Sequence, residues 1–98
     1  ADRILIAPAT ADLLSRLAVG SANGILEALI LSARVPVYIA PAMDTDMWDH
    51  PATQENVTKL KSFGYIFLGP VRGLLASGRR GMGRLMESEE IVNRVLKK

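Results

Sequence analysis

Short apolar segments alternate with segments of helical periodicity along this chain, and the alternation limits the folds that it can adopt. The apolar segments cover residues 3–7, 35–40 and 65–68, and a proline directly follows each of the first two. Runs this short and this apolar are typical of strands that are buried on both faces of a parallel sheet. Strands that alternate with helices indicate an α/β fold, in which helices cover the faces of that sheet.

The predicted helices have recognisable ends. Thr10 can cap a helix that runs to about Val19, and Asp12 in its first turn suits the positive end of the helix dipole. Further helices are expected over residues 25–33, 51–63 and 87–98. Residues 41–50 and 72–83 are predicted to be loops, the second of them rich in glycine.

Length bounds the domain organisation. A chain of 98 residues forms one domain at most. Three strands make a thin α/β sheet, and the first strand begins at residue 3. We therefore predict that residues 1–98 are the C-terminal half of a larger domain, whose earlier strands are missing or are supplied by another chain.

Composition argues against several classes of site and partner. The formal net charge of +2 is too small to indicate nucleic acid, so the clustered basic residues are interpreted as a solvated face. They are Arg72, Arg79, Arg80, Arg84, Arg94, Lys97 and Lys98. Without cysteine, and with one histidine, no disulfide and no metal site is predicted. No apolar run approaches the ~20 residues that span a bilayer, and no signal sequence opens the chain, so no membrane association and a cytoplasmic location are expected.

Ligands of open α/β sheets collect beyond the carboxyl ends of the strands. In this chain those ends are residues 8–12, 41–48 and 69–83. The first two strands end in the same tripeptide, Ala-Pro-Ala, whose small side chains leave room for a flat ligand. The same pattern is explained equally well by the small residues and prolines that commonly end strands and begin loops in α/β folds.

The segment Pro41–Trp48 is unusual because it places large apolar side chains in a predicted loop. Met43, Met47 and Trp48 either fill a local core or an oligomer interface, or they form a lid over a ligand with Asp44 as its polar contact. A metal pair or an acid/base pair at Asp44 and Asp46 is conceivable, but a capping or turn role is favoured.

The glycine-rich segment gives a weaker signal. Ser77 has no evident histidine partner, which argues against a serine nucleophile. Gly78, Gly81 and Gly83 resemble phosphate-binding glycines, but no P-loop helix follows them. We interpret residues 72–83 as a flexible flap that carries arginines.

These segments together resemble a known family, the homo-oligomeric flavin-containing cysteine decarboxylases. Pro41–Trp48 (PAMDTDMW) resembles their substrate clamp Pro-X-Met-Asn-X-X-Met-Trp, and Ala7–Asp12 (APATAD) resembles their flavin-contact loop. Leu75–Gly83 (LASGRRGMG) resembles their flap, which usually reads Leu-Ala-Cys-Gly at its start. Residues 50–56 and 81–91 are similar to the phosphopantothenoylcysteine decarboxylases in particular. The match covers essentially the whole chain.

The resemblance implies a Rossmann-like three-layer domain that binds FMN and assembles as trimers or multiples of trimers. It implies oxidation of the substrate thiol, which creates the electron sink for loss of carbon dioxide. It also implies a phosphopantothenoylcysteine substrate and, in many relatives, a ligase domain in the same polypeptide. The family's catalytic histidine and its FMN-phosphate loop are expected upstream of residue 1. Sister flavoproteins, acting on peptidyl-cysteine or forming a dipicolinate synthase subunit, and a non-catalytic FMN-binding regulatory relative remain alternatives.

The resemblance also assigns candidate site residues. Ser77 takes the position of the family's proton-donating cysteine. The candidate substrate contacts are Met43, Asp44, Met47 and Trp48. The candidate FMN contacts are Pro8, Ala9, Thr10, Ala11, Asp12, Leu13 and Met43.

Three of these residues depart from the family pattern. Asp44 replaces the clamp asparagine, and its charge would repel a substrate carboxylate unless Asp44 is protonated or an arginine such as Arg79 or Arg80 bridges the two acids. Ser77 is a far weaker acid than a thiol, whose pKa is ~8.5, so water or another group supplies the proton, or Ser77 only orients it. Asp12 replaces an asparagine at the flavin ring, where it can accept a hydrogen bond but not donate one.

Overall fold

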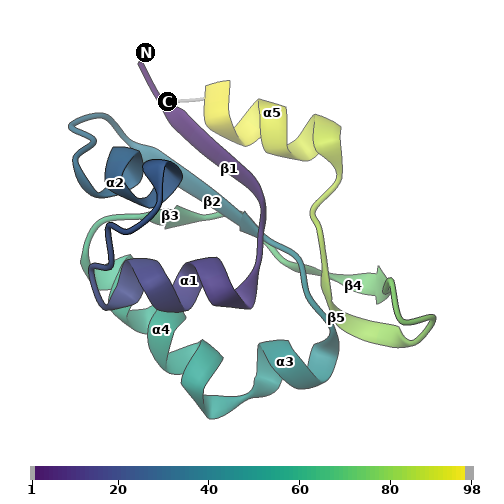
Figure 1. Cartoon of the computed structure of the whole chain (residues 1–98). Coiled ribbons are helices and arrows are strands. Elements are labelled where there is room, and N and C mark those ends of the chain that lie inside the picture. Colours follow the sequence, from purple (N-terminus) through teal and green to yellow (C-terminus); the bar gives the residue numbers. More distant parts are fainter. Residues whose placement is uncertain (1, 97–98) are drawn as a thin grey trace.

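A three-stranded parallel sheet forms the centre of the molecule. The computed structural model describes residues 2–96. Its sheet has the order β1-β2-β3 (Figure 1), built from β1 (Ile4–Ala9), β2 (Val37–Pro41) and β3 (Ile66–Phe67). The register pairs Ile4 with Val37 and Tyr38 with Ile66. The parallel sheet confirms the α/β fold that the alternating segments predicted.

Helices follow each strand of the sheet. They are α1 (Ala11–Ala18), α2 (Ile25–Leu31), α3 (Thr45–Asp49), α4 (Pro51–Ser62) and α5 (Ser88–Leu96). Thr10 caps α1 as predicted, because its Oγ1 accepts a hydrogen bond from the Leu13 amide at 3.2 Å. His50, which was predicted to lie in a loop, caps α4 by accepting from the Ala52 amide at 3.0 Å.

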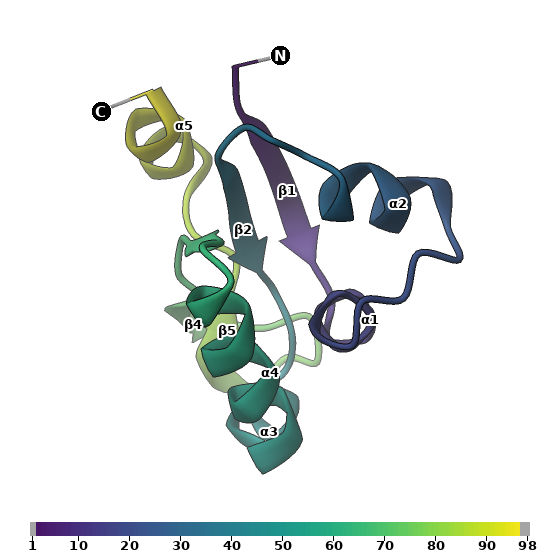
Figure 2. The ribbon, with the colours of Figure 1, turned by 90° about the vertical axis from the view of Figure 1, so that its left-hand side faces the viewer.

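Strand β2 sends alternate side chains into two separate cores, as the period of a strand requires. Val37 and Ile39 pack with residues of β1, α1, α2 and α4 on one face of the sheet. Ala40 and the half-buried Tyr38 pack on the other face, with residues that include Ile91 of α5. Accordingly α5 lies across the sheet from α1 and α2 (Figure 2). The sheet is therefore covered on both faces, which is the predicted three-layer arrangement.

Two predicted loops contain regular structure, so both predictions were wrong in this respect. Residues 41–50 include the short helix α3, and residues 72–83 lie largely in an antiparallel hairpin of β4 (Val71–Leu74) and β5 (Arg80–Arg84). The hairpin was missed because glycine is disfavoured in strands, and glycines here stand opposite each other in the ladder at Gly73 and Gly81. The predicted end of the last helix, residues 97–98, lies outside the described residues.

No helix within residues 2–96 combines the length and the apolar character needed to cross a membrane.

Leu14 of α1 is fully buried in the main core. We expect Leu14→Ala to lower the free energy of unfolding of the intact protein by about 2–5 kcal/mol, because it removes apolar contacts and leaves a cavity. Val19, whose side chain is largely exposed, supplies the control, and Val19→Ala is expected to change stability by less than about 0.5 kcal/mol. Urea unfolding measures both, and similar losses in the two variants would contradict this assignment of the core.

Gly83 of β5 combines a positive φ of 135° with close packing. A Cβ at this position would collide with the Met43 carbonyl oxygen, whereas a Cβ at Gly78, with φ 90°, would meet nothing within 4 Å. Gly78→Ala should therefore lower the free energy of unfolding by about 1–2 kcal/mol, because it adds backbone strain alone. Gly83→Ala should lower the free energy of unfolding further, because β5 must also move away from Met43. Urea unfolding of the two variants tests this, and equal losses would refute the close-packing argument.

Candidate functional site

The carboxyl ends of β1 and β2 lie side by side, as the two Ala-Pro-Ala segments led us to expect. Ala9 pairs with Pro41 in the sheet, and the Ala42 amide donates to the Ala9 carbonyl oxygen at 3.1 Å. Ala9 itself is fully buried. Ala9 joins the two strand ends and is shielded by the residues around it. Its predicted contact with FMN would therefore be indirect.

The β4–β5 hairpin docks on the segment that follows β2. The Met43 amide donates to the Gly83 carbonyl oxygen at 2.9 Å, and Thr45 Oγ1 donates to the Met82 carbonyl oxygen at 2.7 Å. Both bonds join residues about forty positions apart in the sequence, and Figure 1 shows the hairpin beside α3. The predicted clamp and the predicted flap thus form one structural unit.

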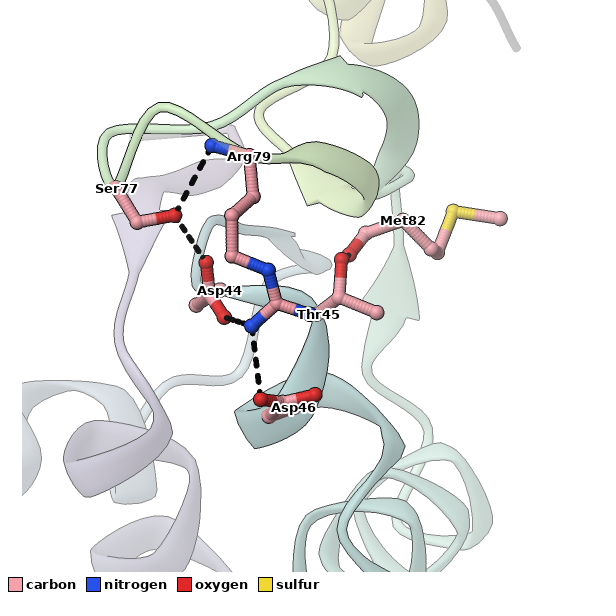
Figure 3. Close-up of polar contacts among 6 residues, drawn as sticks. All are labelled: Asp44, Thr45, Asp46, Ser77, Arg79 and Met82. Atoms are coloured by element: carbon pink, nitrogen blue, oxygen red, sulfur yellow. Dashed lines mark hydrogen bonds and ion pairs between the residues drawn. The ribbon is translucent and has the colours of Figure 1, made fainter.

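A polar network closes this unit at the tip of the hairpin (Figure 3). Ser77 Oγ donates to Asp44 Oδ1 at 2.5 Å. Arg79 Nη1 donates to Asp44 Oδ2 at 3.3 Å and to Asp46 Oδ2 at 2.8 Å. Each oxygen of Asp44 therefore has a partner on the hairpin. Asp44 occupies the N-cap position of α3, but its side chain makes no capping hydrogen bond.

The network favours the ionised form of Asp44. The hydrogen bond from Ser77 is the main cause that holds the pKa of Asp44 below its ordinary value, and the positive charge of Arg79 acts in the same direction. The hydrogen bond and charge of Asp46, followed by the charge of Asp44, raise the pKa of Arg79. Of the two hypotheses for Asp44, protonation is therefore disfavoured. Arg79, and not Arg80, is the arginine that contacts it.

Three predicted site residues meet at one pocket. Met43, Asp44 and Ser77 lie in its wall, and its volume of about 220 Å³ accommodates a small chemical group. The remaining lining residues come from the hairpin, from the segment after it and from the residue before Met43. They are Ala42, Leu74, Leu75, Ala76, Gly83, Arg84 and Leu85.

The other two clamp residues lie outside this pocket lining. Met43 and Trp48 both pack against the main core, whereas the Met47 side chain is half exposed. Gln54 of α4 holds the Trp48 carbonyl oxygen through Nε2 at 2.6 Å. The core interpretation of this segment is thus confirmed for Met43 and Trp48, and Met43 also lines the pocket. The lid interpretation stays a prediction.

The predicted FMN contacts between Pro8 and Leu13 lie apart from this pocket and differ in exposure. Pro8 and Thr10 are exposed, and Ala11 and Leu13 are half-buried. Asp12 is exposed on α1, where its Oδ2 forms an ion pair with Arg16 Nε at 3.0 Å. None of these residues lines the pocket that holds Ser77.

Sequence reasoning missed Thr45 and the exact role of Asp46. No motif marks Thr45, because its hydroxyl binds a carbonyl oxygen of β5. That strand was not predicted, since its segment is rich in glycine. Asp46 was considered only as a cap or as part of an acid pair. Within residues 2–96 no cluster of three or more potential metal-ligating side chains occurs.

Comparison with known proteins places this geometry in a family. The model of the family described as Flavoprotein matches residues 1–98. The chain is 53% identical over 91 residues to the coenzyme A biosynthesis bifunctional protein CoaBC of Mycobacterium tuberculosis, covering 93% of this chain and 22% of that protein. It is 54% identical over 95 residues to a cysteine/cysteine sulfinic acid decarboxylase from an unknown prokaryotic organism, covering 97% of this chain and 26% of that protein.

The solved structures that resemble this chain come from the same kinds of protein as its sequence relatives. A PPC decarboxylase mutant complexed with pantothenoylaminoethenethiol superposes with a TM-score of 0.94 at 34% identity, over 97% of this chain and 53% of that one. The FMN binding protein AtHal3 gives 0.86 at 33% identity, over 97% and 52%. The chain thus spans about a quarter of the length of the curated relatives and about half of the solved structures. The chain belongs to the flavoprotein family and is homologous to flavin-dependent cysteine decarboxylases.

Proposed function

We propose that this chain is part of an enzyme that decarboxylates 4'-phosphopantothenoylcysteine to 4'-phosphopantetheine in coenzyme A biosynthesis, with FMN as cofactor. The observation that carries the proposal is the pocket in which Met43 and Ser77 meet, at the positions where the family has its clamp and its proton donor. The 53% identity to CoaBC supports the choice of substrate. The proposal includes a ligase domain in the same polypeptide, a trimer or a multiple of trimers, and a cytoplasmic location.

The exposure of residues at the end of β1 is compatible with contact to a flat cofactor. Pro8, within β1, and Thr10, just after it, are both exposed. With Ala11, Asp12 and Leu13 they would hold the FMN ring. When bound, FMN supplies the oxidation of the substrate thiol and the later return of the two electrons.

The chain's own residues position the substrate. Ser77, which lines the pocket, donates a hydrogen bond to the ionised Asp44 and accepts one from the Arg79 amide at 3.4 Å. We assign Ser77 the role of orienting the group that protonates the enethiolate, since a hydroxyl bound to a carboxylate is a poor acid. Asp44 has both oxygens engaged, so it holds the hairpin in place instead of binding the substrate carboxylate directly.

A second candidate substrate is free cysteine. The chain is 54% identical to a cysteine/cysteine sulfinic acid decarboxylase over nearly its whole length. Free cysteine carries an ammonium group beside the carbon that loses carbon dioxide, and the ionised Asp44 would attract that group. In phosphopantothenoylcysteine the same nitrogen is a neutral amide.

A direct comparison of the two substrates tests the proposal. The intact protein should be purified with bound flavin, seen by its absorption spectrum, and carbon dioxide release should be measured with each thiol acid. We expect kcat/KM to be higher for phosphopantothenoylcysteine. A higher value for free cysteine would favour the second candidate, and release from neither substrate would contradict both.

Substitution of Ser77 tests its assigned role. We expect Ser77→Ala to slow formation of the reduced thiol product roughly 10- to 100-fold and to release enethiol, because the protonating group loses its orientation. Ser77→Cys should yield the reduced product, since a thiol remains a far stronger acid than a hydroxyl even where the neighbouring Asp44 raises its pKa. Mass spectrometry separates the two products. Ser62→Ala, whose hydroxyl bonds only within α4, is the control, and an unchanged product ratio in Ser77→Ala would remove Ser77 from the mechanism.

Acid is expected to release the hairpin from the clamp. Because the pKa of Asp44 is lowered in the folded state, its contribution to docking is complete above the ordinary aspartate pKa and is lost as pH falls through the lowered value. Amide hydrogen exchange in residues 75–80, followed between pH 7 and pH 3, should report this release. Asp44→Asn should abolish the transition, whereas Asp49→Asn should keep it. Persistence of the transition in Asp44→Asn would assign it to another group.

A further inference from the structure

The β4–β5 hairpin carries a concentrated positive charge. Residues 71–84 contain four arginines and no acidic residue. Two of the four have partners: Arg79 binds Asp44 and Asp46, and Arg84 donates to the Leu74 carbonyl oxygen at 2.8 Å and lies 4.0 Å from Glu87. The charge of these two arginines is therefore at least partly balanced within the chain.

The other two arginines are different. Arg72 and Arg80 are exposed, and neither forms an ion pair or a side-chain hydrogen bond with the residues that the structure describes, 2–96. The ladder places Arg72 opposite Met82 and Arg80 opposite Leu74, so the two arginines are diagonal neighbours. Diagonal positions in an antiparallel pair are ~7–8 Å apart, and like charges at such spacing repel each other unless an anion lies between them.

Both arginines border one groove on the hairpin. The groove has a volume of about 430 Å³ and is lined by Arg72, Gly73, Arg80 and Gly81. A Cβ on Gly73 would meet the Arg84 side chain, and one on Gly81 would meet the Thr45 side chain. The face of the hairpin to which these two glycines point is therefore covered by Arg84 and Thr45. Because side chains alternate along a strand, Arg72 and Arg80 project from the other side, where Leu74 and Met82 occupy the second diagonal of the ladder.

We infer that Arg72 and Arg80 form a binding site for a phosphate monoester. A guanidinium group offers paired N–H donors that match phosphate oxygens, and two such groups balance the charge of one phosphate. The groove also adjoins the candidate pocket, because Leu74 lines that pocket and is the ladder partner of Arg80. For one ligand to occupy both, it must pass around the edge of the hairpin at Leu74, from the pocket to the face that carries the two arginines.

The identity of the phosphate bearer rests on the proposed function, but the anion site does not. If the substrate is 4'-phosphopantothenoylcysteine, its cysteine end occupies the pocket of Met43 and Ser77, and its phosphate binds Arg72 and Arg80. Free cysteine has no such group, so the site also distinguishes the two candidate substrates.

The anion site is tested first with inorganic phosphate, without any decarboxylation assay. Calorimetry on the intact protein at constant ionic strength should give a phosphate Kd that rises at least about tenfold in the double variant Arg72→Gln/Arg80→Gln. The control, Arg94→Gln, removes a positive charge from α5, where Arg94 pairs with Glu90, and should leave the Kd unchanged. No phosphate binding by the wild type, or equal Kd values in the wild type and the double variant, would overturn the site.

Two substrates that differ only in the phosphate group test which molecule brings the phosphate to the site. The double variant should raise KM for phosphopantothenoylcysteine at least about tenfold and leave KM for pantothenoylcysteine, which lacks the phosphate, unchanged. Equal increases for both substrates would overturn the assignment of this phosphate to the site. If the wild type turns over neither substrate while the arginines still bind inorganic phosphate, the proposed function fails and the anion site stands. Thermal unfolding of each variant verifies that it is folded.

Discussion

The contact between Gly83 and Met43 organises the candidate site. At this point the backbone of β5 lies directly against the carbonyl group of Met43, and a side chain on Gly83 would separate them. The hydrogen bond from the Met43 amide to Gly83 fixes the register of the contact. The remaining links between hairpin and clamp, from Thr45 and Asp44, are side-chain contacts that can form only once the two backbones have approached this closely.

Packing around the sheet fixes both segments that meet at the contact between Gly83 and Met43. Met43 follows β2, which is paired on both sides and buried on both faces. The hairpin is anchored at its base, where Val71, Leu85 and Met86 pack with the second core beneath α5. The tip of the hairpin carries Ser77 and Arg79, which lie in exposed positions and are held mainly by polar bonds. Apolar packing therefore holds the base of the hairpin, and polar bonds hold its tip.

The sequence predicted those parts of the fold that depend on hydrophobic pattern and on local signals. The apolar segments marked the three parallel strands, and Thr10 marked the start of α1. The hairpin and α3 could not be predicted, because their stability comes from contacts between distant residues and not from propensity. Gly81 illustrates this: its missing side chain makes room for Thr45, which lies 36 positions earlier in the sequence.

Three residues of the candidate pocket were predicted from the sequence, but most of the bonds among them were not. Met43, Asp44 and Ser77 were singled out from the family resemblance, and they do line one pocket. A contact between Asp44 and Arg79 was one of the stated hypotheses, but the bonds from Ser77 to Asp44 and from Arg79 to Asp46 were not anticipated, since an aspartate in a turn has many local partners. Spacing within the chain carries no information about which residue of a distant hairpin will reach it.

The sharing of Asp44 between two partners has a consequence for how this site can change in evolution. One carboxylate oxygen serves Ser77 and the other serves Arg79, so the effects of substitutions at these three positions should not add. An asparagine introduced at position 44 would leave Asp46 as the one carboxylate paired with Arg79 among these residues, and a cysteine at position 77 would have its pKa raised by the charge of Asp44. A change at any one of these positions therefore alters the constraints on the other two, so substitutions that are neutral singly and in combination should be rare among the three.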